Sequence, residues 1–214
     1  MMPQRFVVDY PRRCLTILDA MERYARSMNL LVSFSLIMAS PLFLIPYERM
    51  KSKHPLRDRE IEPELHKRLK RLGKQRFMGA EIWKTEPPID WRFSRIVNDP
   101  NKPRKWCDEN GAHPSSEQTN TIDRRDFDDV ARVIRNALAH GNIVYLNEQW
   151  GEEENRPIGW LAFISRYEET SDEREAAETY RVVAAKPDEF LRFVRLWAEW
   201  LEKQWPEQEL RAAS

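Results

Sequence analysis

One stretch of the chain has sixteen residues without a charge, and it limits what the N-terminal part can fold into. Residues 30–45 read LLVSFSLIMASPLFLI. A helix that spans a membrane needs about 20 apolar residues, and Pro41 and three serines interrupt or dilute this run. We therefore expect a long helix over residues 12–39. Its second half should be buried on most sides, and Ser40 and Pro41 should end or kink it. A membrane span is the alternative.

Composition places the chain among soluble globular proteins. Its 214 residues can bury a core without disulfides. The 35 Lys and Arg balance the 35 Asp and Glu, so the whole molecule exerts no strong long-range attraction on nucleic acid or membranes. Cys14 and Cys107 lack metal-ligand spacing and are predicted to be reduced thiols. With no signal-peptide pattern at the start, we expect a cytoplasmic protein with one domain over residues 1–214.

The remaining pattern predicts a mainly α-helical bundle with a small antiparallel β-sheet. Helices are expected over residues 62–74, 123–140 and 188–204, the last with Phe190, Val194, Trp197 and Leu201 on one face. Short β-branched and aromatic runs predict a β insertion over residues 143–185, between the last two of these helices. Residues 84–122 are rich in Pro, Asn, Ser and Gly and predict a long functional or mobile loop, with a short strand at residues 91–97.

Local charge is less even than the total. Residues 49–76 hold 11 Lys or Arg and four Asp or Glu, whereas residues 148–178 hold ten acids and three Arg. These stretches fit two solvated surfaces. They also fit a basic patch for an RNA backbone with an acidic face elsewhere.

The helix over residues 123–140 ends in the polar sequence RNALAHGN. At 100° per residue, one stripe is apolar and predicts the buried side. Asn136 lies opposite that stripe, and Arg135 and His140 are roughly 140° apart around the axis. Gly141 suits the left-handed residue that closes a helix. Exposed polar residues, and a histidine in the last turn, are common in helices that have no catalytic role. The pattern alone therefore also fits an ordinary helix surface. The members of the expected buried stripe are Phe127, Val130, Ala131, Ile134, Ala137 and Leu138.

The stretch IRNALAHGNI resembles the Arg-Asn-x-x-x-His signature of the HEPN superfamily. The long first helix and the terminal helix after a small sheet are also similar to one bacterial HEPN branch. The resemblance implies a helical bundle, a two-fold homodimer whose motif helices face each other, and metal-independent RNA cleavage in a toxin–antitoxin or phage-defence setting. It implies that Arg135 and His140 are catalytic residues and that Asn136 is a positioning residue. The expected RNA-binding residues are Arg132, Lys67, Arg68, Lys70 and Arg71.

These residue types suit RNA cleavage, because RNA carries its own nucleophile in the 2′-hydroxyl. A histidine can accept or donate a proton near neutral pH. A planar guanidinium can hold two phosphate oxygens as negative charge builds. The expected products are a 2′,3′-cyclic phosphate and a 5′-hydroxyl. No cofactor or metal is needed, and a cognate antitoxin protein is a candidate partner.

Other chemistries find less support. The glycines form no phosphate-binding loop, and no Gly-x-Ser-x-Gly elbow occurs. His54, His66 and His113 lack the spacing of a zinc site and are expected to be exposed. Trp91 and Trp106 are candidates for stacking on bases. The rival hypotheses are a non-catalytic HEPN-like RNA-binding or protein-interaction module and a membrane-associated protein.

Overall fold

The structure is a computed structural model that describes residues 6–50, 62–84, 86–152, 157–166 and 179–204. The chain forms two compact units. The helical unit combines residues 1–72, 81–83 and 191–214, and the sheet unit combines residues 73–80 and 84–190. The middle of the chain therefore builds the sheet unit, while both ends belong to the helical unit.

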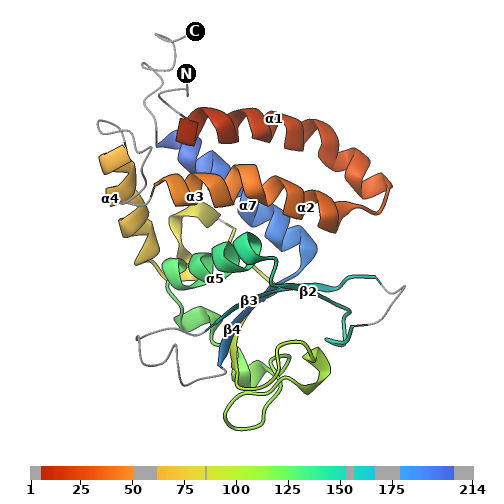
Figure 1. The fold of residues 1–214 in the computed structure, drawn as a ribbon. Coiled ribbons are helices and arrows are strands. Elements are labelled where there is room, and N and C mark those ends of the chain that lie inside the picture. The colour runs from red at the N-terminus through yellow and green to blue at the C-terminus, as the bar shows by residue number, and fades with distance from the viewer. Residues whose placement is uncertain (1–5, 51–61, 85, 153–156, 167–178, 205–214) are drawn as a thin grey trace, which may run out of the picture. The chain divides into compact units, whose positions relative to one another are not determined.

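The helical unit is held together by aromatic contacts between its elements. Phe43 packs edge-on against Phe193 and Trp197, with ring centroids 5.2 and 5.3 Å apart. The prediction for the last helix is confirmed, because Phe190, Val194, Trp197 and Leu201 are all buried. The helices described here are α1 (Phe6–Ser27), α2 (Leu31–Ala39), α3 (Ile45–Arg49), α4 (Glu62–Gly73) and most of α7 (Pro187–Lys203) (Figure 1).

The prediction of one helix over residues 12–39 is wrong, because α1 ends at Ser27 and α2 begins at Leu31. Asn29 adopts the left-handed conformation at φ 57°, which Asn tolerates better than most residues. The backbone N–H of Leu30 then donates to the carbonyl of Ala25 at 2.8 Å. The chain therefore turns between the helices, and α1 lies alongside α2 and α3 (Figure 1).

Pro41 does not end the second helical stretch. The chain continues through a widened π-helical turn over Ser40–Leu44 into α3, which accommodates the proline ring. Leu42 and Phe43 are buried, whereas Ile37 is 68% exposed, so this stretch is buried on one side and not on most sides. By length and composition Leu31–Arg49 could cross a membrane, a property that core helices of soluble proteins share.

The sheet unit contains a four-stranded antiparallel sheet in the order β1-β4-β3-β2. The predicted small sheet is thus confirmed. Its edge strand β1 confirms the short strand predicted at residues 91–97 within the long loop, and Phe93 of β1 lies opposite Val183 of β4. The strands are β1 (Trp91–Ile96), β2 (Ile143–Leu146), β3 (Trp160–Arg166) and β4 (Tyr180–Ala185).

Helix α5 (Phe127–His140) packs against β3 and β4. Side chains alternate between the faces of a strand, and Ser165 of β3 contacts α5 through Asn136. Leu161 and Phe163 therefore lie on the same face as Ser165, toward α5. The opposite face carries a second buried cluster, made of Ile96, Trp106, Leu146, Trp150, Trp160, Ala162, Ile164, Val182 and Ala184.

Residues 86–122 are more ordered than their composition suggests, because short polar side chains bind the backbone. The Oδ1 of Asn120 accepts from the N–H of Phe93 and of Ile122 at 3.1 and 3.2 Å. The Oδ1 of Asp108 accepts from Asn110 and Ala112, both at 2.9 Å. Such bonds replace regular secondary structure, so a polar composition does not make this segment mobile.

The prediction that Trp91 and Trp106 stack on bases is wrong. Their exposed fractions are only 3% and 1%. The indole N–H of Trp91 donates to Glu189 at 3.3 Å, and that of Trp106 donates to the carbonyl of Pro100 at 3.1 Å. Both rings are therefore core residues with their polar atom satisfied.

Candidate active site

Helix α5 begins later than predicted, with Asp126 as its N-cap residue. Asp123 lies instead in a 3-10 turn over Ile122–Arg124. The carboxylate of Asp126 accepts from Arg76 Nη1 at 2.8 Å, and the Arg76 backbone pairs with Asp126 in an isolated antiparallel bridge. The start of α5 is therefore fixed to the segment that precedes β1.

The buried side of α5 largely matches the predicted stripe. Leu138 is only half-buried, whereas Val133, which the stripe omitted, is buried. The buried arc is therefore wider on the Val133 side than one narrow stripe. Arg135 and Asn136 are half-buried, and His140 is exposed. The helical geometry keeps Arg135 and His140 roughly 140° apart.

The place of Asn136 opposite the stripe suggested a side chain that points into solvent, but the side chain is engaged with the sheet. Its Nδ2 donates to the Oγ of Ser165 on β3 at 2.9 Å. Ser165 is buried, and its hydroxyl donates onward to the carbonyl of Arg166 at 3.4 Å. Asn136 therefore ties the motif helix to the end of β3, which is a positioning role.

His140 is the last residue of α5, and the chain leaves the helix directly after it. Gly141 is left-handed at φ 73°, as predicted, and the N–H groups of Gly141 and Asn142 turn back to the carbonyl of Ala137. This closing turn leaves the imidazole exposed. Arg135 lies deeper, and its Nε is out of contact with solvent.

The expected RNA-binding residues divide between the two units. Arg132 is exposed on α5 and pairs with Asp128 at 2.8 Å. On α4, in the helical unit, Lys67 pairs with Glu64 at 2.5 Å, and Arg68 donates to Gln204 at 3.0 Å.

Lys70 is exposed and Arg71 lies 3.8 Å from Glu81, so both add to the positive charge of α4. Parts of the basic stretch 49–76 and of the acidic stretch 148–178 lie outside the described residues. The RNA-binding assignment stays a prediction.

A pocket of about 420 Å³ opens where α5 ends. It is formed by chain segments that are distant in sequence, so no local sequence pattern indicates it. Its lining residues are Pro100, Asn101, Gly141, Asn142, Ile143, Val144, Ile164, Arg166 and Tyr180.

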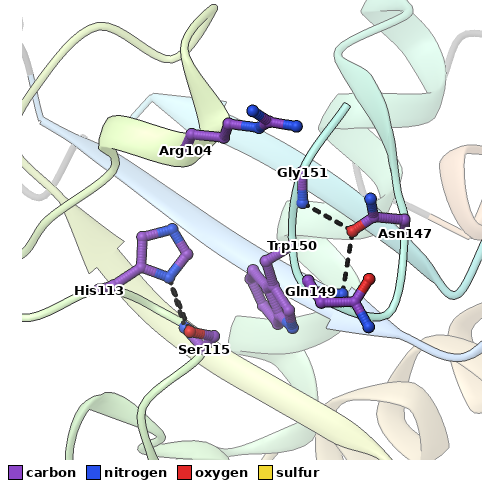
Figure 2. Close-up of a pocket in the computed structure, with 7 residues that line it drawn as sticks. All are labelled: Arg104, His113, Ser115, Asn147, Gln149, Trp150 and Gly151. Atoms are coloured by element: carbon purple, nitrogen blue, oxygen red, sulfur yellow. Dashed lines mark hydrogen bonds between the residues drawn. The ribbon is translucent and has the colours of Figure 1, made fainter. Parts of the chain in front are cut away.

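A second pocket, of about 460 Å³, lies around Arg104, His113 and the turn at Asn147–Gly151 (Figure 2). The Nδ1 of His113 accepts from the N–H of Ser115 at 3.1 Å, and its Nε2 lies 2.9 Å from the carbonyl of Pro103. Both ring nitrogens of His113 thus contact groups of the loop, so the imidazole links Pro103 to Ser115.

The expectation that the other histidines are exposed is also wrong where the structure describes them. His66 is half-buried, with Nδ1 2.9 Å from the carbonyl of Met50, and His113 is half-buried. His54 lies outside the described residues. Within the described ranges, no three His, Cys, Asp or Glu side chains are grouped as metal ligands.

A comparison with protein-family models matches residues 1–208 to the family described as HEPN pEK499 p136. The chain belongs to this HEPN family. The match spans residues of both units and supports the resemblance found in the motif. Comparisons with curated proteins and with solved structures give no match. Membership indicates a HEPN-like helical fold and a nuclease, RNA-related or nucleotide-binding module.

Proposed function

We propose that this HEPN protein is a metal-independent endoribonuclease. The proposal rests on one observation: a chain of a HEPN family carries Arg135, Asn136 and His140 on the last turns of α5, with the imidazole exposed. HEPN domains are often ribonucleases. An exposed histidine can meet a substrate as large as RNA, which a buried one cannot.

The reaction needs only proton transfers and charge stabilisation. The imidazole of His140 takes the proton of the 2′-hydroxyl, whose oxygen then bonds to the adjacent phosphorus. The bond from phosphorus to the 5′ oxygen breaks, and that oxygen receives a proton from an imidazolium. The guanidinium of Arg135 stabilises the extra negative charge on the phosphate. The products are a 2′,3′-cyclic phosphate and a 5′-hydroxyl.

We further propose that two copies form a two-fold dimer through the exposed side of α5. One helix separates Arg135 and His140 by roughly 140°, which is too wide for one phosphate. A second copy would bring another Arg and His into the same cleft. Ala139 is exposed between them and is small enough to allow a close approach of two helices.

The proposed setting is a bacterial toxin–antitoxin or phage-defence system in the cytoplasm, with an antitoxin protein as a further partner. It follows from the resemblance of the motif to HEPN ribonucleases of such systems. Co-purification with the product of a neighbouring reading frame would test the antitoxin.

A second candidate function is a non-catalytic RNA-binding module. Two observations favour it: Asn136 is engaged with Ser165, and the Nε of Arg135 is out of contact with solvent. Both residues then serve the fold of the sheet unit more than chemistry. This candidate binds RNA without cutting it.

Cleavage of a 5′-labelled single-stranded RNA in excess EDTA separates the two candidates. The enzyme should produce cyclic-phosphate ends, whereas the binding module should leave the RNA intact. His140→Ala and Arg135→Ala should each lower the cleavage rate by at least about 100-fold. Arg124→Ala is the matched control, because Arg124 is exposed before the other end of α5.

Circular dichroism must show that the helical signal of each variant is retained. Full activity of either motif variant would overturn the catalytic assignment. Loss of cleavage in EDTA with recovery in magnesium would overturn the metal-independent mechanism.

A further inference from the structure

The pocket at the end of α5 begins one residue beyond His140, since Gly141 and Asn142 line it. Backbone hydrogen bonds fix the wall of the pocket that Asn142 forms. The N–H of Asn142 donates to Ala137 of α5 at 3.0 Å, and the N–H of Ile164 on β3 donates to the carbonyl of Asn142 at 2.9 Å. The pocket therefore has a fixed position relative to the catalytic motif.

The chemistry of the lining suits a flat ring with a polar edge. Side chains alternate along a strand, so Val144 and Ile164 share one face of the sheet and supply an apolar wall, and Tyr180 on the same face supplies an aromatic ring. Aromatic rings stack on bases that are not paired. A carboxamide such as that of Asn142 offers both donors and an acceptor, which matches the edge of a nucleobase.

The charge of the lining suits an anion. Arg166 lies at the end of β3 directly opposite Tyr180 of β4. None of the described residues that line this pocket is acidic. A guanidinium binds phosphate through two parallel hydrogen bonds. A ring site and a phosphate-binding group thus belong to the same pocket.

The size of the pocket limits the ligand to about one nucleotide. Small-molecule sites have volumes of about 300–1,000 Å³, and this one has about 420 Å³. In the other pocket near the sheet, shown in Figure 2, the ring nitrogens of His113 and the Oδ1 of Asn147 bind groups of the protein itself.

We propose that the pocket lined by Asn142, Arg166 and Tyr180 binds one nucleotide unit. The base lies against the apolar wall and Tyr180, and a phosphate binds Arg166. If the proposed ribonuclease function holds, this unit is the RNA nucleotide next to the cut phosphate, and the pocket sets base preference. Asn136 supports the arrangement by linking α5 through Ser165 to the backbone of Arg166.

Binding can be measured without any cleavage, so its failure and the failure of catalysis are distinguishable. The probes are a fluorescent single-stranded RNA that is 2′-O-methylated throughout, which has no nucleophile, and the four nucleoside 5′-monophosphates. Arg166→Gln and Asn142→Ala should each weaken binding of the RNA by about tenfold or more. Arg124→Gln, a matched Arg variant away from the pocket, should change it by less than about twofold.

Both pocket residues are exposed, so their replacement should leave the fold intact, and thermal melting checks this. RNA containing 4-thiouridine should crosslink to Tyr180 or residues 142–144. Unchanged affinity in both pocket variants, or crosslinks only to other segments, would overturn the proposal. Binding of monophosphates but not of RNA, with the same sensitivity to Arg166, would support the nucleotide site. It would also show that the bound nucleotide is free and is not part of an RNA chain.

Discussion

At the scale of single residues, the structure changes the role of Asn136 most. Its position opposite the apolar stripe suggested a residue facing solvent or a second subunit. The hydrogen bond to the buried Ser165 instead places it in a partly buried link between α5 and β3. The chemistry proposed for the site therefore depends on Arg135 and His140, and Asn136 acts through the geometry that it maintains.

We predict that Asn136→Ala lowers the free energy of unfolding by about 1–2 kcal/mol, because it leaves the buried Ser165 hydroxyl without its donor. In the Asn136→Ala background, Ser165→Ala should cost less than it does alone, since the two residues share one bond. Urea unfolding of the single and double variants measures this. Strictly additive effects would contradict the link.

At the scale of elements, the closing turn of α5 positions both the motif and the pocket. Gly141 takes a left-handed conformation at φ 73°, and a Cβ built there would meet no atom within 4 Å. The requirement for glycine is therefore conformational and not steric. The same turn carries His140 on one side and Asn142 on the other.

Gly141→Ala should accordingly destabilise the fold by about 1 kcal/mol. It should also weaken nucleotide binding if the turn shifts. Gly79→Ala is the control, because Gly79 has equal space for a Cβ but no positive φ. Thermal melting compares the two, and equal melting temperatures would refute the conformational argument.

Within the helical unit, an ion-pair cluster fastens α1 to α7. Glu22 accepts from Arg26 at 2.8 Å and from Arg195 at 2.8 Å. Burial alone would raise the pKa of Glu22, but these hydrogen bonds outweigh it, so the pKa is lowered. A lowered folded-state pKa means that the cluster stabilises the fold above the unfolded value of about 4.3. That stabilisation is lost as the pH falls through the folded-state pKa.

Glu22→Gln should therefore lower the free energy of unfolding by about 1 kcal/mol at pH 7, and the difference from the wild type should vanish in acid. Denaturant titrations between neutral and acidic pH measure it. Glu64→Gln removes a surface pair with Lys67 and should have no measurable effect. A Glu22→Gln deficit that persists at low pH would point to lost packing instead.

At the scale of the whole molecule, the proposed dimer completes the catalytic site, because each copy would contribute an Arg135 and a His140. Light scattering at micromolar concentration should give about twice the 25.6 kDa chain mass. Ala139→Arg should produce monomers with reduced cleavage, because it places a large charged group on the exposed face where two α5 helices would meet. Arg124→Ala should remain dimeric. A monomeric wild-type protein that cuts RNA at full rate would rule out the shared site.

Local sequence patterns place most helices and strands and the motif, although they join α1 and α2 into one helix. Apolar residues every three or four positions mark α5 and α7, since one face of a helix must be buried, and Gly141 marks the end of α5. The same local signals also indicated the small sheet, and the Arg-Asn-x-x-x-His pattern indicated the family to which residues 1–208 match. These features depend on neighbours within one or two turns, which a linear sequence shows directly.

Which polar and aromatic side chains are available to a ligand depends on contacts that form only when the chain folds. Trp91 and Trp106 lie in a polar, proline-rich segment, yet strand pairing and packing bury them. Asn136 finds its partner 29 positions away. The pocket joins Asn101, Asn142, Arg166 and Tyr180 from four separate segments. Contacts between residues far apart in the chain follow from the pairing of strands and the burial of side chains, and no local pattern encodes them.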